Sequence, residues 1–300
     1  MTERILVIRL GALGDILLCM QAFQDIRAAW PNACLTLQTM PAFAGLGRAM
    51  PWFDAVVEDP RPSFLQLSQW WKLGAALRGG NFTRVIDFQN KPRTWIYCKL
   101  FLSKAEWHGD ATPREERIHH QVKILRQTRA MGIKDSGPLK LDWLSAPVDG
   151  LNLPPAYAVL IPGCAPHRPE KRWPSSHFAA LARELKAKGL TPVLVGTKAD
   201  TQVIAEIKQD AEFAFDLCGK TGFPQLASLF RGARLAVGND TGPTHLAAIL
   251  GTPTLSLFSN ASDPARSGPM GARVAWLQRE KLDDLAVEEV IEALSRLTFG

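Results

Sequence analysis

The stretch Val237–Pro253, "VGNDTGPTHLAAILGTP", joins an apolar run to an apolar helical pattern through a short polar turn. Pro243 suits the first helical turn, because the N–H that proline lacks would have no partner inside the helix there. A buried strand that passes directly into a helix is the repeating unit of α/β proteins with parallel sheets. We therefore expect a strand over residues 234–238 and a helix that starts near Gly242.

The same alternation extends in both directions along the chain. Strands are expected over 4–10, 33–39, 84–88, 157–162, 191–196, 234–238 and 252–258, and helices over 14–30, 65–80, 175–189, 199–211, 223–233 and 282–297. The segment Leu144–Ala156, rich in proline and glycine, breaks this rhythm. We predict two Rossmann-like domains, 1–146 and 157–300, joined by a linker at 147–156, with the last helix able to pack back on the first domain. Ligands would bind in a cleft between the domains, at the carboxyl ends of the strands.

Composition is that of a globular protein, with 46% hydrophobic and 21% charged residues. The net charge of +6 favours an anionic partner such as a nucleotide, a nucleic acid or a phosphorylated membrane surface, although many cytoplasmic enzymes share this balance. Five scattered cysteines without a C-x-x-C pair argue against structural zinc and for reduced thiols. Since no run approaches eighteen apolar residues and the amino terminus has the pattern of a strand, we expect a cytoplasmic protein.

Three absent motifs narrow the chemistry. The chain has no G-x-x-x-x-G-K-[ST], which disfavours a Walker-type nucleotide hydrolase, and no G-x-S-x-G nucleophile elbow. It has no D-x-D triplet, so paired aspartates that could hold a metal beside a diphosphate are missing. If a diphosphate leaves, protein groups must stabilise it.

The turn after the first predicted strand contains Gly11, Gly14 and Asp15. Its G-x-x-G-D spacing differs from the G-x-G-x-x-G of dinucleotide sites, and the glycines would allow a ligand to approach the backbone closely. Asp15 has two interpretations: it caps the first helix, or it accepts a proton from a hydroxyl nucleophile.

Two further segments could hold an anion. Arg168, Lys171 and Arg172 lie in the loop "GCAPHRPEKRWP", where they either neutralise a diphosphate or form a solvated basic loop; the neighbouring Trp173 could simply be packing.

In the second segment, the backbone N–H groups of Thr241, Gly242 and Thr244 at the predicted helix start suit a phosphate. His245 contacts the ligand or packs, and Asp240 caps the helix or binds sugar hydroxyls.

Together, "ILVIRLGALGDILLCMQAFQDIRAAWP", "KRWP", "VGNDTGPTHLAAILGTP" and "DPARSGPMG" resemble the ADP-heptose:lipopolysaccharide heptosyltransferases, glycosyltransferase family nine, over nearly the whole chain. The resemblance implies a GT-B fold and an inverting, metal-independent transfer of heptose from an ADP-sugar to the lipopolysaccharide inner core, with no cofactor and no nucleic acid. It implies Asp15 as catalytic base and a set of donor-binding residues, namely Lys171, Asp240, Thr241, Gly242 and His245. Gly14, Arg168 and Thr244 are further candidates near the donor phosphates. The turn "SNASDP" is one residue longer than the family pattern, and the loop after Gly163 lacks the usual Ala-Ser or Thr-Thr.

The acceptor implied by the resemblance is a Kdo–lipid A surface, rich in carboxylates and phosphates. Candidate contacts are Lys91, Arg93, Arg114, Arg117, His119, His120 and Lys123, each of which could equally belong to a solvated charged face. An enzyme with such an acceptor would associate peripherally with the inner face of the inner membrane. Two rival functions remain: a nucleotide-sugar epimerase of the same fold, and a non-catalytic nucleotide-sugar-binding relative.

Overall fold

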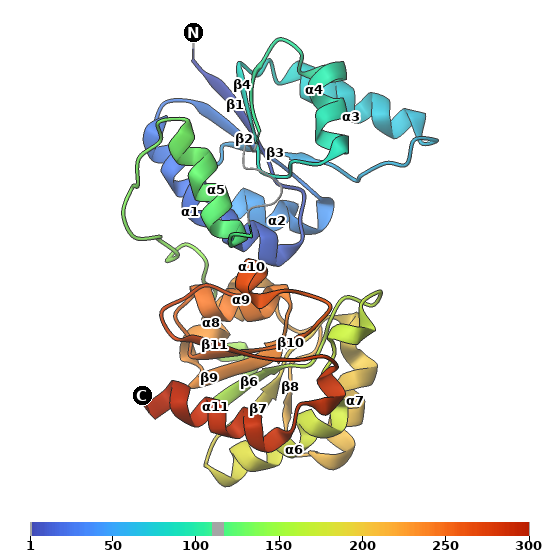
Figure 1. Ribbon diagram of the computed structural model, residues 1–300, viewed down its shortest axis with the longest axis vertical. Coiled ribbons are helices and arrows are strands. Elements are labelled where there is room, and N and C mark those ends of the chain that lie inside the picture. The colour runs from blue at the N-terminus through green and yellow to red at the C-terminus, as the bar shows by residue number, and fades with distance from the viewer. Residues whose placement is uncertain (1, 110–116, 300) are drawn as a thin grey trace. The chain divides into compact units, whose positions relative to one another are not determined.

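The chain forms two compact units, Met1–Trp143 and Leu144–Gly300, in a computed structural model that describes residues 2–109 and 117–299. The division falls just before the predicted linker at 147–156. Each unit is a parallel sheet with helices on both faces (Figure 1).

The first unit contains five parallel strands in the order β3-β2-β1-β4-β5. They are β1 (Arg4–Ile8), β2 (Cys34–Thr39), β3 (Ala55–Glu58), β4 (Arg84–Asp87) and β5 (Glu106–His108). The helices are α1 (Leu13–Ala29), α2 (Pro41–Ala49), α3 (Leu67–Gly79), α4 (Pro92–Phe101) and α5 (His120–Ala130). Because the chain steps outward from β1 in both directions, the topology reverses between β1 and β4, which is where open α/β sheets place ligands.

Burial on both faces explains the continuous apolar character of β1. Leu6 and Ile8 pack toward α3 and α4 in one core cluster with Leu77 and Tyr97. Ile5 and Val7 are equally buried, and successive strand side chains point to opposite faces. The sheet is therefore covered on both sides, as parallel sheets require.

The second unit contains six parallel strands in the order β11-β10-β9-β6-β7-β8. They are β6 (Tyr157–Ile161), β7 (Thr191–Leu194), β8 (Phe215–Asp216), β9 (Leu235–Asn239), β10 (Thr254–Ser259) and β11 (Val274–Arg279). The helices are α6 (Ser175–Ala187), α7 (Thr201–Asp210), α8 (Phe223–Gly232), α9 (Gly242–Ile249), α10 (Pro264–Ser267) and α11 (Val287–Phe299). Four short 3-10 turns complete the chain: η1 (Asp149–Leu151), η2 (Pro169–Lys171), η3 (Lys198–Asp200) and η4 (Leu282–Asp284).

Trp173 anchors the core of the second unit. Its side chain is fully buried in the cluster formed by α6, α7, α11 and the sheet, and its ring meets Phe178 edge-on at 4.9 Å between centroids. The indole N–H donates to the carbonyl of Leu285 at 2.9 Å. This bond gives a partner to the one polar atom of the side chain, which is otherwise buried among apolar groups. The packing interpretation of this residue is confirmed.

All the predicted strands and helices are present, but the final helix begins later than expected. The pattern predicts a helix from residue 282, whereas Leu282–Asp284 form η4 and α11 starts at Val287. The reason is that Leu282 and Leu285 are both buried while the Ala286 N–H donates to Glu289 Oε1 at 3.2 Å, so that the helix is capped there. α11 contacts α6, β10 and β11 of its own unit.

We expect Trp173→Ala to lower the free energy of unfolding by about 3–5 kcal/mol, because the substitution leaves a large cavity and an unpaired Leu285 carbonyl. The half-exposed Trp276 on β11 is the matched control, and Trp276→Ala should cost less than about 1 kcal/mol. Urea unfolding followed by circular dichroism measures both changes. Equal losses from the two variants would contradict the assigned role of Trp173.

Candidate functional site

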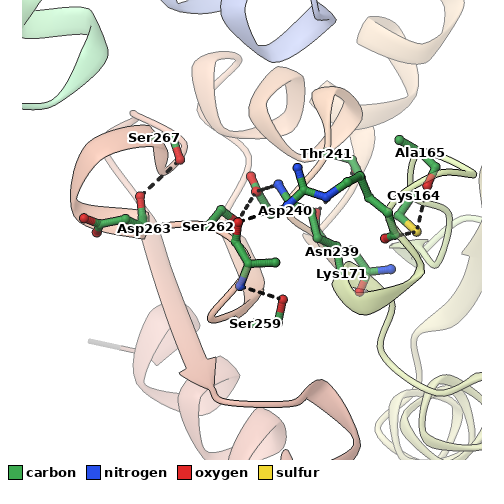
Figure 2. A network of polar contacts seen from close by, with 12 residues as sticks. Cys164, Ala165, Lys171, Asn239, Asp240, Thr241, Ser259, Ser262, Asp263 and Ser267 are labelled. Carbon is green, nitrogen blue, oxygen red and sulfur yellow. Dashed lines mark hydrogen bonds and ion pairs between the residues drawn. The ribbon is translucent and has the colours of Figure 1, made fainter.

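Polar side chains of the second unit gather where β6, β9 and β10 end. These three strands are neighbours in the sheet and run parallel, so their carboxyl ends share one edge. The loops that follow them bring Lys171, Asp240 and Ser262 together from distant parts of the sequence (Figure 2). This cluster is the candidate site of the second unit.

Asp240 is the centre of the cluster and is nearly buried, with 8% of its side chain exposed. Its Oδ2 accepts hydrogen bonds from Lys171 Nζ at 2.6 Å and from Ser262 Oγ at 2.7 Å. His245 Nε2 lies 3.6 Å from Oδ1. The carboxylate is thus surrounded by donors from three different loops or helices.

The surroundings of Asp240 determine its ionisation. Burial alone would raise the pKa of the carboxyl, but His245, Lys171 and Ser262 favour the charged form more strongly, and the pKa falls to about 2. Asp240 is therefore a carboxylate at neutral pH, and its negative charge balances the positive charge of Lys171.

Asn239, the last residue of β9, fixes the loop that carries Lys171. Its amide nitrogen donates to the carbonyls of Pro162 and Gly163 at 2.8 and 3.3 Å, and its Oδ1 accepts the Trp173 N–H at 3.0 Å. The side chain is completely buried. Sequence reasoning did not single out Asn239, although a polar residue at the end of an apolar strand was a visible signal.

The start of α9 agrees in part with the predicted anion site. Thr241 is the N-cap residue, and among the described residues no hydrogen bond is donated by the N–H of Thr241 or of Gly242. The prediction for Thr244 is wrong in one respect, because its N–H donates to the Thr241 carbonyl at 3.1 Å. Its Oγ1 donates to the Asn239 carbonyl at 2.7 Å and the residue is fully buried, so Thr244 holds the turn together.

The surroundings of His245 fit the packing interpretation, and its contact with a ligand stays a prediction. The imidazole is buried within the unit, which fits packing, yet Nε2 faces Asp240. The other ring nitrogen, Nδ1, is buried and has no hydrogen-bond partner among the described residues. Among the described residues, the imidazole is thus oriented only through Nε2, which faces Asp240.

Two of the three cations singled out in the loop after β6 are paired with acids, whereas no ion pair is found for Arg172 among the described residues, and its buried Nε has no hydrogen-bond partner there. Lys171 binds Asp240, and Arg168 forms an ion pair with Glu170 while its Nη2 donates to the Ala261 carbonyl at 3.0 Å. Arg168 therefore ties this loop to the turn after β10. Ser262 in that turn was missed from the sequence; the unusual length of "SNASDP" was its indirect signal.

In the first unit, Asp15 occupies the first turn of α1 and has 37% of its side chain exposed. Its Oδ2 accepts the N–H of Ala12 at 3.0 Å, which confirms the capping interpretation. Its Oδ1 pairs with Arg9 Nη2 at 2.9 Å. Gly14 lies inside α1 and is buried, so it belongs to the helix and not to a loop.

Gly11 is required by its backbone and its neighbours. Its φ of +147° lies in the region that favours glycine, and a Cβ there would sit 2.6 Å from the Phe43 ring. The close approach thus involves a side chain of the same unit.

Arg9 is the residue of this region that sequence reasoning missed. It follows β1, is buried, and its Nη1 donates to the Phe88 carbonyl at 2.5 Å while Nη2 binds Asp15. Because its guanidinium is anchored on Phe88, the residue after β4, the Asp15 carboxylate has a defined position. A cation inside an apolar strand-to-turn segment was the available signal.

The predicted acceptor residues have varied surroundings. Lys91 is exposed and precedes α4, and Arg93 is committed to the fold, donating to the Pro62 carbonyl at 3.0 Å and lying 5.4 Å from the Trp70 ring centroid. Arg117 is exposed, while His120 starts α5 behind the N-cap residue His119 and Lys123 lies one turn further. Arg114 lies outside the described residues.

Close to Lys91, the buried Asp87 at the end of β4 organises the start of α4. Its Oδ2 accepts a hydrogen bond from Thr94 Oγ1 at 2.6 Å. Burial raises the pKa of Asp87, and the hydrogen bonds from Thr94, Asn90 and Gln89 offset this only in part.

None of the described helices is long and apolar enough to cross a membrane. No group of three or more His, Cys, Asp or Glu side chains in residues 2–109 and 117–299 could hold a metal ion. A cavity of about 430 Å³ lined by Leu185, Arg234 and Ile291 lies at the amino ends of the second sheet, away from the candidate site.

The fold of both units recurs in a solved bacterial glycosyltransferase. The structure of Escherichia coli heptosyltransferase WaaC with ADP matches with a TM-score of 0.79 at 20% identity, over 98% of this chain and 100% of that one. The two parallel sheets therefore define a protein of the GT-B class.

Sequence comparison identifies the family. The profile of "Glycosyltransferase family 9 (heptosyltransferase)" matches residues 102–292. The chain is 39% identical to lipooligosaccharide heptosyltransferase 2 of Haemophilus ducreyi, covering 92% of this chain and 88% of that protein. It is 26% identical to lipopolysaccharide heptosyltransferase 1 of Escherichia coli K12, covering 98% and 100%. The protein belongs to glycosyltransferase family 9.

The depressed pKa of Asp240 predicts a pH-dependent contribution to stability. The ionised carboxylate stabilises the fold fully above the ordinary aspartate pKa of 3.8, and this stabilisation is lost as pH falls toward the folded value of about 2. The stability gap between wild type and Asp240→Asn should therefore shrink by about 2 kcal/mol between pH 5 and pH 2. Urea unfolding at half-unit pH steps measures the gap, with the exposed Asp283→Asn as control for loss of one charge. A gap independent of pH would contradict the assignment.

Proposed function

We propose that this enzyme transfers a heptose from an ADP-sugar to the inner core of lipopolysaccharide, with inversion at the anomeric carbon and without a metal. The observation that carries the proposal is the Lys171–Asp240–His245 cluster at the start of α9, in a chain that belongs to family 9. That a solved relative holds ADP supports the choice of nucleotide.

The diphosphate of the donor would bind at the amino end of α9. The N–H groups of Thr241 and Gly242 have no partner among the described residues, and the positive end of the helix dipole favours an anion there. Lys171 lies beside the same turn, because its ammonium donates to the Asp240 carboxylate. When the glycosidic bond breaks, ADP gains negative charge, and donors aimed at this charge stabilise the transition state more than the ground state.

Asp240 cannot itself face a phosphate without repulsion, so its proposed role is different. It holds the Lys171 ammonium at 2.6 Å and leaves other acceptor positions on the carboxylate for sugar hydroxyls. His245, whose Nδ1 is unpaired among the described residues, would orient the donor in the same cluster. These groups act in binding and orientation, while Asp15 would act on the acceptor.

We assign the proton transfer to Asp15. The acceptor hydroxyl oxygen attacks the anomeric carbon, its proton passes to the Asp15 carboxylate, and the bond to the β-phosphate oxygen breaks so that ADP leaves with the electron pair. The partial exposure of Asp15 leaves its carboxylate accessible to a hydroxyl, and the anchored Arg9 orients it.

The acceptor and setting follow from the same proposal. The first unit would bind the anionic Kdo–lipid A acceptor through cations such as Lys91, Arg117 and His120, and the second unit would bind the donor. The enzyme would work in the cytoplasm, attached peripherally to the inner membrane. An epimerase or a non-catalytic binding protein would not transfer the sugar, so an assay of transfer distinguishes the three functions.

Asp15→Asn should lower the rate of transfer by about 10²–10⁴ while leaving donor binding intact, because the amide keeps the capping acceptor but cannot take a proton. Turnover of ADP-heptose with Kdo₂–lipid A, assayed in EDTA because the proposal invokes no metal, measures this loss.

Asp15→Ala separates the two roles of the residue. It removes both the cap and the base, and should cost about 1 kcal/mol of stability beyond Asp15→Asn. If Asp15→Asn transfers heptose at the wild-type rate, Asp15 is a cap and the proposed mechanism is wrong.

Lys171→Met should weaken ADP binding by about tenfold or more, since it removes a charge-assisted contact with the diphosphate. Calorimetry with ADP, GDP and UDP measures the affinity, and the exposed Lys198→Met is the matched control. Equal affinities for the three nucleotides would exclude an ADP-sugar donor, and unchanged binding by Lys171→Met would remove Lys171 from the site.

A further inference from the structure

The first unit presents large apolar side chains to solvent from two adjacent helices. Trp71 is 70% exposed and Leu65 is 93% exposed, and both belong to the loop and first turns of α3. We call the whole set the α3–α4 surface, and it comprises Phe64, Leu65, Leu67, Trp71, Trp95 and Leu100. α3 and α4 contact each other, as Figure 1 shows. Soluble proteins seldom expose so many large apolar groups together without a partner.

Local contacts order the loop before α3, which carries Phe64. The Ser63 N–H donates to Gln66 Oε1 at 2.8 Å, and Trp70 Nε1 donates to the Ser63 carbonyl at 3.0 Å. The Phe64 ring stacks on Trp70 with 5.8 Å between centroids. Leu67 and Trp71 are four residues apart on α3 and therefore share one face of the helix. The fold thus presents an ordered apolar edge.

The charge around this surface has one sign. Residues 60–105 contain one acid, Asp87, which is buried. The same stretch contains eight cations: Arg61, Lys72, Arg78, Arg84, Lys91, Arg93, Lys99 and Lys104. Of these, Arg84 is paired with Glu3 and Glu106. Lys72 directly follows Trp71, and Lys99 Nζ lies 5.6 Å from the Trp95 ring centroid.

We propose that the α3–α4 surface docks on an anionic phospholipid bilayer, with Leu67, Trp71 and Trp95 in the interfacial region and Lys72 and Lys99 among the headgroups. Tryptophan suits the boundary between headgroups and acyl chains, and lysine beside it can extend its ammonium toward phosphates while its stem stays apolar. Each basic side chain near an anionic surface adds to the attraction.

A lipid surface explains this composition better than a protein partner does. The apolar centres of protein interfaces are enriched in tryptophan but depleted in lysine, whereas here lysines lie beside the tryptophans. An apolar and basic segment whose one acid is buried matches the negative potential of an anionic leaflet. The inference rests on the proposed function, because a lipid-linked acceptor is the reason for the enzyme to bind a membrane. The position of the docking surface is argued from the exposed side chains of α3 and α4.

Vesicle flotation tests the proposal with the full chain. Wild type should bind vesicles of phosphatidylcholine with 30 mol% phosphatidylglycerol at least about tenfold better than vesicles of phosphatidylcholine alone, and binding should weaken with added salt. The double variant Leu67→Ser/Trp71→Ser should lose about tenfold or more in partitioning, and so should Lys72→Gln/Lys99→Gln. All four side chains are exposed, so the fold should survive, which circular dichroism checks.

The matched control is Phe213→Ser/Trp276→Ser, which removes two comparably sized exposed side chains from the second unit. It should bind vesicles as wild type does. Equal binding by the control and the α3–α4 variants, or no binding by wild type, would overturn the proposal. A change in molar mass of the Leu67→Ser/Trp71→Ser variant by light scattering, without vesicle binding by wild type, would assign the surface to contact between copies of this chain.

A second assay separates this inference from the proposed function. Transfer to a deacylated, water-soluble core acceptor needs no membrane, so the α3–α4 variants should retain wild-type rates on it. If vesicles bind as expected but no ADP-sugar is ever turned over, the proposed function fails and the docking surface stands. If transfer proceeds but the variants bind vesicles normally, the docking surface fails alone.

Discussion

The buried amide of Asn239 is the contact on which the geometry of the second unit's site depends. One side chain at the end of β9 bonds three backbone groups of the segment between β6 and α6, at Pro162, Gly163 and Trp173. Buried backbone groups left without partners cost about 1–3 kcal/mol each, so few other side chains could replace it. Because the same segment carries Lys171, the position of that ammonium beside Asp240 follows from Asn239. Asn239, a structural residue in the core, thus sets the distance between Lys171 and Asp240 at the edge of the sheet.

Two aspartates that each follow a strand end differ in what their surroundings allow. Asp240 is almost buried and its carboxylate accepts from Lys171 and Ser262, with His245 close by. Its depressed pKa makes it a poor proton acceptor. Asp15 is more exposed and is bound by one backbone N–H and one guanidinium. These environments support the roles proposed for the two residues, with proton transfer assigned to Asp15 and orientation to Asp240.

Sequence periodicity was sufficient for the fold class and the central strands, but not for the edge strands or the partners of the site residues. Buried parallel strands have continuous apolar patterns, which is why β1, β6 and β9 were predictable. The edge strands β8 and β11 contain no buried residue and lack that pattern, and neither was expected. Arg9 and Ser262 could not be assigned because their roles come from contacts with Phe88 and Asp240, far away in the sequence. Thr244 shows the reverse error, since its position in the helix start suggested a free N–H that the first turn in fact uses.

The excess positive charge of the chain has a location that composition could not reveal. A net charge of +6 suggested an anionic partner, and the basic loop after β6 was one of the places considered for it. In the structure Lys171 and Arg168 are both balanced by carboxylates, which leaves Arg172 as the cation of the three without an ion pair among the described residues. Residues 60–105, in contrast, carry cations with no exposed acid among them. Long-range attraction to anionic surfaces depends on unbalanced charge, whereas recognition of a diphosphate depends on a few donors at fixed positions. We therefore propose that the two tasks belong to different units of the chain, since the unbalanced cations lie in the first unit and the fixed donors lie in the second.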